Sequence, residues 1–146
     1  MDDFAQVEIL LVEDTATDAE MTIRALRRRG LANRLVWVRD GSEALDFLFR
    51  QGIYSGRDGS RPKLILLDVK MPKVDGIDVL RRVMQDETLR TMPVVMLTSS
   101  AEERDLVESY RLGANSYIVK PVDSEDFDRV VSEMGMYWML VNKLPS

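Results

Sequence analysis

Five short apolar segments recur along this sequence, each followed by residues whose apolar positions have helical spacing. The segments lie at 7–12, 35–38, 64–67, 94–97 and 117–119. Several are nearly continuous rather than alternating, which is typical of parallel strands covered on both faces. We therefore predict an α/β fold, with a doubly wound five-stranded parallel sheet in the order 2-1-3-4-5 and helices on both faces.

Signals at helix ends support the intervening helices. Three pairs have the spacing of a capping box or of its acidic variant: Thr15 with Asp18, Asp40 with Glu43, and Ser100 with Glu103. We expect the helix after Ser100 to end at Gly113, because glycine readily adopts a positive φ. Residues 127–141 carry an apolar stripe at helical spacing, which should face the sheet or a partner.

Composition limits the chemistry of the chain. Its 146 residues suffice for one domain, predicted to span 1–146 with 136–146 as an apolar C-terminal extension. A formal charge of −5 does not favour nucleic acid. Cysteine and histidine are absent from the sequence, which excludes disulfide, zinc–thiolate and imidazole chemistry. No apolar run reaches the roughly 18 residues of a membrane span, and no signal peptide is apparent, so we expect a cytoplasmic protein.

Polar residues follow four of the five segments. Glu13 and Asp14 follow the first, Asp68 the third, Thr98 the fourth and Lys120 the fifth. Because parallel strands end at the same edge of a sheet, these side chains should converge on one shallow cleft. Singly, each has a simpler interpretation as a helix cap, a strand-end hydroxyl or an ion-pair partner. That interpretation is poor for the set, since it requires four coincidences.

Such a cluster can perform only a narrow range of chemistry. Three neighbouring carboxylates repel one another, so either one holds a proton or a cation lies among them. Oxygen ligands favour a hard cation such as Mg²⁺. A carboxylate beside that cation can attack a phosphoryl group, with Lys120 and Thr98 stabilising charge on its oxygens. Transfer of this kind depends mainly on positioning and charge, so a general base is dispensable.

The order of these motifs resembles that of a two-component response regulator receiver domain. The matching stretches are V-E-D at 12–14, L-L-D-x-x-M-P-x-x-D-G at 66–76, L-T-S at 97–99 and Y-I-V-K-P at 117–121. The similarity covers nearly the whole chain and implies a flavodoxin-like fold. It also implies that Asp68 is phosphorylated, taking its phosphoryl group from a histidine of a sensor histidine kinase.

The same resemblance implies roles for the neighbouring residues. Asp14, Asp68 and the backbone carbonyl of Lys70 would bind Mg²⁺ directly, while Glu13 would act mostly through water. Glu13 stands where many members of the family have aspartate, which should alter the metal geometry more than abolish binding.

Two further positions carry over from the family pattern. Thr98 and Lys120 resemble the catalytic pair that holds the phosphoryl oxygens. Tyr117 matches the aromatic switch position, whose ring moves inward when the Thr98 side is drawn to the phosphate.

A narrower resemblance concerns partners. The loop at 52–62, L-G-A-N-S-Y at 112–117 and Y-W-M-L-V-N-K-L-P at 137–145 look like small regulators paired with phytochrome-type histidine kinases. We expect 52–62 to be a mobile loop, either a solvated insertion or a partner contact. The apolar stretch 136–141 either packs on its own core or forms a homodimer face with strand 5 and the last helix.

We interpret the chain as a phosphoacceptor switch, which is not an enzyme that turns over a substrate. Two other functions compete with this interpretation. A haloacid-dehalogenase-type phosphatase also uses a strand-end aspartate and Mg²⁺, but it needs a second acid where this chain has Lys70. A receiver-like scaffold that is never phosphorylated would not need the acid set, Thr98 and Lys120. Phosphoryl mass added by acetyl phosphate with Mg²⁺ distinguishes the switch from the scaffold.

Overall fold

The computed structural model describes residues 8–28, 30, 34–57, 61–71, 74–99, 111–120 and 129. The elements are β1 (Ile9–Val12), α1 (Ala16–Arg27), β2 (Leu35–Val38), α2 (Gly41–Phe49), η1 (Gly52–Tyr54), β3 (Leu64–Asp68), α3 (Gly76–Met84), η2 (Leu89–Thr91), β4 (Val94–Thr98) and β5 (Ser116–Val119), with η marking 3₁₀ helices. The helix start after Ser100, most of the stripe at 127–141 and the extension 136–146 lie outside the described residues. No helix in the described ranges is long and apolar enough to cross a bilayer.

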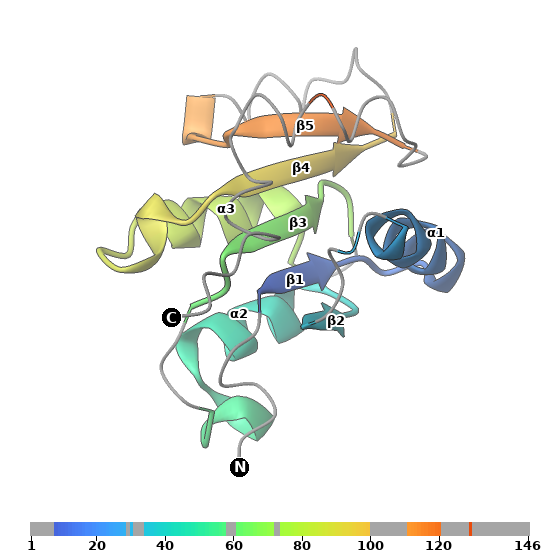
Figure 1. Cartoon of the computed structure of the whole chain (residues 1–146). Coiled ribbons are helices and arrows are strands. Elements are labelled where there is room, and N and C mark those ends of the chain that lie inside the picture. Colours follow the sequence, from blue (N-terminus) through green and yellow to red (C-terminus); the bar gives the residue numbers. More distant parts are fainter. Residues whose placement is uncertain are drawn as a thin grey trace, which may run out of the picture.

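The five strands form one parallel sheet in the order β2-β1-β3-β4-β5, which confirms the predicted topology (Figure 1). Val12 is paired with Val38 on one side and with Leu67 on the other, so β1 and β2 end level with one another and β3 extends one residue further, to Asp68. Asp68 is paired with Leu97, and Thr98 with Val119. This register brings the residues at the carboxyl ends of the strands to one edge of the sheet.

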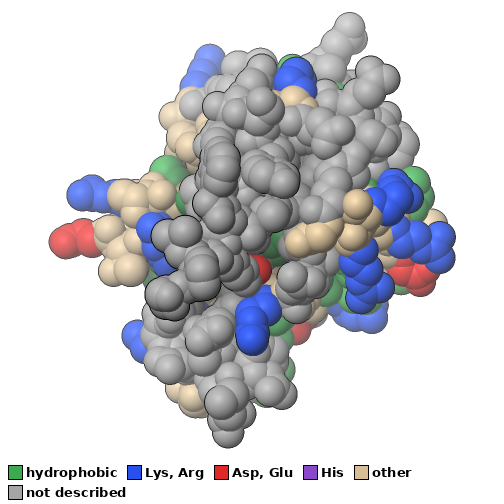
Figure 2. Space-filling model, in the orientation of Figure 1, with side chains coloured by type: hydrophobic (Ala, Val, Ile, Leu, Met, Phe, Trp, Pro, Cys, Tyr) green, Lys and Arg blue, Asp and Glu red, His purple; other side chains and the backbone are tan. Residues whose placement is uncertain are grey.

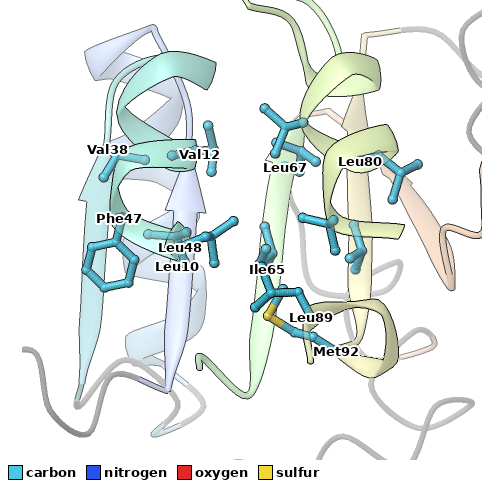
Figure 3. Packing of buried hydrophobic residues seen from close by; sticks show 14 of the residues in the cluster. Leu10, Val12, Val38, Phe47, Leu48, Ile65, Leu67, Leu80, Leu89 and Met92 are labelled. Carbon is cyan, nitrogen blue, oxygen red and sulfur yellow. The ribbon is translucent and has the colours of Figure 1, made fainter. Parts of the chain in front are cut away.

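Apolar residues are nearly continuous in the central strands because both faces of the sheet are covered. Along β3, Ile65 and Leu67 point to the face covered by α2 and α3. Leu80 of α3 lies on the Leu67 side of this cluster, and Phe47 of α2 lies nearer Leu10 and Val38 (Figure 3). Leu64 and Leu66 point to the opposite face and belong to a separate cluster with residues of α1. Burial of both sets drives the sheet and helices together, since each fully buried aliphatic side chain contributes about 1.5–3 kcal/mol.

Two of the described helices begin with a side-chain cap, and one predicted cap is wrong. The Asp40 carboxylate accepts a hydrogen bond from the Glu43 N–H at 2.8 Å, as the capping spacing predicts. Asp75 caps α3 in the same way, at 3.0 Å from the Asp78 nitrogen. Thr15 stands at the N-cap of α1, but its side chain makes no capping bond. Its backbone N–H donates instead to the carboxylate of Glu13, two residues earlier in the chain.

The loop predicted at 52–62 is more structured than its composition suggests. Residues Gly52–Tyr54 form η1, and the Tyr54 ring packs edge-on against Phe47 with centroids 5.0 Å apart. Arg57 is also buried. The prediction of a mobile loop is therefore wrong for its first half, because an aromatic ring and a guanidinium group anchor it to α2.

The ends of two helices match their sequence signals. Arg111 and Leu112 are helical and Gly113 has a φ of 103°, which confirms the helix end expected there. Arg24 and Arg27 lie in the last turn of α1, exposed to solvent, where positive charge suits the helix dipole. Figure 2 shows Lys and Arg side chains gathered over the region of α1, at the right of the view.

Candidate functional site

Charged side chains from three strand ends meet at the carboxyl edge of the sheet. Glu13 and Asp14 follow β1, Asp68 is the last residue of β3, and Lys120 follows β5. Carboxylate oxygens of Glu13, Asp14 and Asp68 all lie within 4.8 Å of one another. The structure thus brings together the three acids that the sequence places at separate strand ends.

Lys120 is the cation of this cluster. Its Nζ lies 2.8 Å from Oε1 of Glu13, 3.3 Å from Oδ1 of Asp68 and 3.1 Å from Oδ2 of Asp18. The backbone of Lys120 is fixed as well, because its N–H donates to the Thr98 carbonyl at 2.7 Å. One ammonium group is therefore shared among three carboxylates, and Asp14 adds a fourth negative charge nearby.

Glu13 is fully buried and is held from two sides. Its Oε2 accepts a hydrogen bond from the Thr15 N–H at 3.2 Å, and its carbonyl accepts one from the Trp37 indole at 2.8 Å. Its Oε1 accepts no hydrogen bond from any residue in the described ranges. Its closest charged neighbour is the Lys120 ammonium group, at 2.8 Å, so Oε1 is held by an ion pair.

The crowding of the acids changes their protonation. Burial and the negative charge of Glu13 raise the pKa of Asp68 to about 8, although Lys120 acts in the opposite direction. Burial alone would lower the pKa of Lys120, but Glu13, Asp68 and Asp18 raise it well above its ordinary value. The cluster therefore has more carboxylates than Lys120 can balance, and a pKa of about 8 favours the protonated form of Asp68 at neutral pH while no metal is bound.

The residues present fit a divalent cation. All donor atoms are carboxylate oxygens, which suit a hard ion, and one oxygen from each of Glu13, Asp14 and Asp68 lies within 4.8 Å of the other two. A cation would remove the repulsion that raises the pKa of Asp68. Lys70 is exposed two residues beyond Asp68, and the role of its carbonyl as a ligand stays a prediction.

Thr98 and Tyr117 are the two remaining residues of the predicted site. Thr98 is the last residue of β4 and is buried, one position beyond the residue paired with Asp68. Tyr117 lies in β5, half-buried, against the hydrophobic cluster on the face of α2 and α3. Tyr117 is paired with Met96, two positions before the pair of Thr98 with Val119, so only Thr98 lies at the strand end beside the acids. The catalytic role of Thr98 and the switch role of Tyr117 stay predictions.

The turn after β3 is shaped by Gly76. The Gly76 N–H donates to the Val69 carbonyl at 2.8 Å, which folds the chain back directly after Asp68. A Cβ atom at Gly76 would lie 2.1 Å from the Asp68 carbonyl oxygen and 2.9 Å from Cα of Val69. Only a residue without a side chain fits there, so Gly76 supports the position of Asp68.

Sequence reasoning missed two residues that contact the cluster. Asp18 was expected only to strengthen a helix start, yet it forms an ion pair with Lys120. Trp37 was expected only as an apolar strand residue, yet its indole N–H bonds the Glu13 carbonyl. Asp18 lies in the first turn of α1, which begins directly after Glu13 and Asp14. That position could have indicated that Asp18 lies close to the cluster. Trp37 carries no comparable signal.

The chain resembles a well-populated group of proteins. The family model for the response regulator receiver domain matches residues 9–132. The probable methanogenesis regulatory protein FilR2 of Methanothrix harundinacea is 43% identical over 137 residues, covering 94% of this chain and 86% of FilR2. Response regulator Rcp1 of Synechocystis is 38% identical over 138 residues, covering 94% of this chain and 92% of Rcp1.

Solved structures agree with this similarity. The bacteriophytochrome response regulator RtBRR has a TM-score of 0.85 and 48% identity, covering 96% of this chain and 84% of that one. The Mn²⁺-bound form of Rcp1 has a TM-score of 0.75 and 37% identity, covering 96% and 99%. The phosphorylated cyanobacterial phytochrome response regulator RcpA has a TM-score of 0.76 and 39% identity, covering 97% and 100%.

Proposed function

This chain belongs to the response regulator receiver family, whose members are phosphoacceptors in two-component signalling rather than catalytic enzymes, and we propose that Asp68 is its phosphoacceptor. The observation that carries the proposal is the contact of Asp68 Oδ1 with Lys120 Nζ at 3.3 Å, within a cluster of two further acids. Asp68 is 5% exposed as a residue and its side chain 8%, so it is buried but not completely sealed from solvent.

The residues around Asp68 suit attack on a phosphoryl group. An oxygen of the ionised carboxylate forms a bond to phosphorus, and the bond from phosphorus to the donor nitrogen breaks. Lys120 already lies beside the attacking oxygen, so its positive charge can stabilise the negative charge that develops on the phosphoryl oxygens. Thr98, at the end of the neighbouring strand, would donate a hydrogen bond to the same group. Tyr117 would report the change by moving inward.

Mg²⁺ is the cation we propose for the acid cluster. Asp14 and Asp68, with the Lys70 carbonyl, would bind it directly, and Glu13 would act mostly through water. When bound, it would neutralise the carboxylates and polarise the phosphoryl oxygens. Two facts support this assignment: the all-oxygen donor set of this chain and the Mn²⁺ bound to its relative Rcp1.

The partner is proposed to be a sensor histidine kinase of the phytochrome type. Because these 146 residues include no histidine, the phosphohistidine donor must lie outside them. The relatives RtBRR and RcpA carry phytochrome in their names, which supports this class of kinase over others.

We also propose that the protein is cytoplasmic and that residues 1–146 form a single receiver domain. It would form a homodimer through β5 and the last helix. Deletion of 136–146 should convert a sedimenting dimer into a monomer, and an already monomeric parent would contradict the dimer.

The test of the phosphoacceptor is mass spectrometry of the protein after incubation with acetyl phosphate and Mg²⁺. The wild-type chain should gain one phosphoryl group, and Asp68→Asn should gain none. Asp78→Asn is a matched control, since Asp78 is an exposed acid that pairs with Arg81 rather than with Lys120, and it should be phosphorylated normally. Phosphoryl mass that survives Asp68→Asn would refute the assignment. Failure of phosphotransfer from a red-light-sensing histidine kinase, with acetyl phosphate still active, would refute only the phytochrome link.

A further inference from the structure

A second group of charged side chains lies at the opposite end of the sheet from the acid cluster. A pocket of about 140 Å³ opens between the C-terminal end of α2, the segment before β3 and η2. Its residues Leu48 and Leu89 pack beside Leu10 and Ile65, whereas the acids follow β1 and β3 beyond Val12 and Leu67 (Figure 3). The function proposed above makes no use of this pocket.

The floor of the pocket is apolar. Leu48 and Leu89 are almost completely buried, and Phe49 is half-buried beside them. The Arg82 guanidinium lies 5.1 Å from the centroid of the Phe49 ring, which holds that ring in place. The pocket is open to solvent on one side, so an aromatic ring placed there would be covered only in part. A flat apolar body therefore fits on these three side chains.

Three guanidinium groups line the same pocket. Arg57 is buried, with its guanidinium 4.2 Å from the Phe47 ring centroid and its Nε donating to the Phe47 carbonyl at 2.9 Å. Its charge is therefore fixed in position. Arg50 and Arg61 are exposed at the rim, and neither forms an ion pair with a residue in the described ranges.

One acid also lines the pocket, but it is already engaged. Oδ1 of Asp86 accepts hydrogen bonds from the N–H groups of Thr88 and Leu89, at 2.8 and 3.0 Å, and so fixes the turn into η2. Among the described residues that line the pocket, three are arginines and one is an acid, on a protein whose net charge is −5. The exposed guanidinium groups of Arg50 and Arg61 at the rim therefore favour the approach of an anion.

We propose that this arginine pocket, formed by Arg50, Arg57 and Arg61 over Leu48, Phe49 and Leu89, binds a small organic anion. The ligand would have a flat apolar body with a phosphate or carboxylate head group. The planar fork of each guanidinium matches the paired oxygens of such head groups. The body would rest on the apolar floor, with the head group at the rim between Arg50 and Arg61.

The test is a titration of the ¹⁵N-labelled full chain with phenyl phosphate, followed by NMR in EDTA so that the acid cluster holds no metal. Saturable shifts should appear at the backbone amides of Phe49, Arg50 and Thr88. Arg50→Asn and Arg61→Gln should each weaken binding about tenfold, the loss expected for a hydrogen bond to a charged group. Asparagine is chosen because residue 50 has a φ of 56°, which asparagine tolerates.

Control variants separate this pocket from general electrostatics and from the phosphoacceptor site. Arg90→Gln removes the same charge from η2 without lining the pocket, and it should change binding by less than about twofold. Asp68→Asn should bind phenyl phosphate like the wild type, so failure of either proposal is recognised separately. Benzyl alcohol, which has the ring without the charge, should cause no saturable shift. The pocket assignment would be overturned by shifts confined to the acid cluster, by no saturation, or by equal losses for Arg90→Gln and Arg61→Gln.

Discussion

Asp18 and Lys120 are 102 positions apart in the sequence, yet Lys120 Nζ donates a hydrogen bond to Asp18 Oδ2 at 3.1 Å. The same ammonium group lies 3.3 Å from Asp68. Asp18 therefore competes with the proposed phosphoacceptor for the charge of Lys120. Because the Asp18 side chain is 40% exposed, solvent screens the competition and its effect should be modest.

Asp18→Asn should accelerate phosphorylation of Asp68 by acetyl phosphate about two- to threefold, an effect typical of a half-exposed ion pair. The physical reason is that more of the charge of Lys120 becomes available to the phosphoryl oxygens. The measurement is the initial rate of phosphoryl incorporation at saturating Mg²⁺. Glu20→Gln removes an exposed acid from the same helix and should leave the rate unchanged. A slower rate in Asp18→Asn would show that Asp18 supports Lys120 rather than competing for it.

The stability of the metal-free protein should fall as the pH rises. Asp68 has a pKa of about 8 in the folded chain and 3.8 as its ordinary value, so between these values the folded state binds more protons than the unfolded state. The free energy of unfolding should therefore decrease between pH 5 and pH 8, by on the order of 3 kcal/mol from this group.

Urea unfolding in EDTA at several pH values measures this dependence. Asp68→Asn cannot ionise at residue 68, so its stability should depend less on pH in the same window. Mg²⁺ should stabilise the wild type most at the upper end of the range, where Asp68 is ionised. Parallel pH profiles for the wild type and Asp68→Asn would contradict the raised pKa.

Gly76→Ala should destabilise the fold by about 3 kcal/mol or more, because the new methyl group would overlap the Asp68 carbonyl and the Val69 Cα. Relief of that overlap requires the turn after β3 to move. Gly56→Ala is the matched control, since a Cβ atom there meets nothing within 4 Å, and it should change stability by less than about 1 kcal/mol. Both values come from urea unfolding; equal stabilities would show that the turn relaxes freely.

The sequence predicts N-terminal caps at both Asp40 and Thr15, but only the Asp40 side chain forms a capping hydrogen bond. Substitution of each residue tests this difference. Asp40→Ala removes a capping hydrogen bond from α2 and should cost about 1 kcal/mol. Thr15→Ala removes a side chain that makes no capping bond, and the backbone bond from residue 15 to Glu13 is retained. It should therefore cost less than about 0.5 kcal/mol. Thermal unfolding at one pH compares them, and an equal loss would mean that Thr15 caps α1 in solution.

The strand order and the acids at the strand ends were predictable because both depend on local patterns. Nearly continuous apolar residues in β3 and β4 indicate strands buried on both faces, and alternation with helices then dictates a parallel sheet. In a parallel sheet the carboxyl ends share an edge, so Asp68 and Lys120 could be placed together without coordinates.

Contacts between distant side chains could not be predicted in this way. The sharing of Lys120 with Asp18, the fixing of Glu13 by Trp37 and the burial of Arg57 against Phe47 depend on how helices lie on the sheet. No periodicity or residue type encodes such distances. The sequence by itself therefore determined the fold and the chemical groups at its functional edge, through periodicity and residue type. Only the tertiary structure decided which charges are shared or buried and where three arginines surround a pocket, because packing between elements sets those contacts.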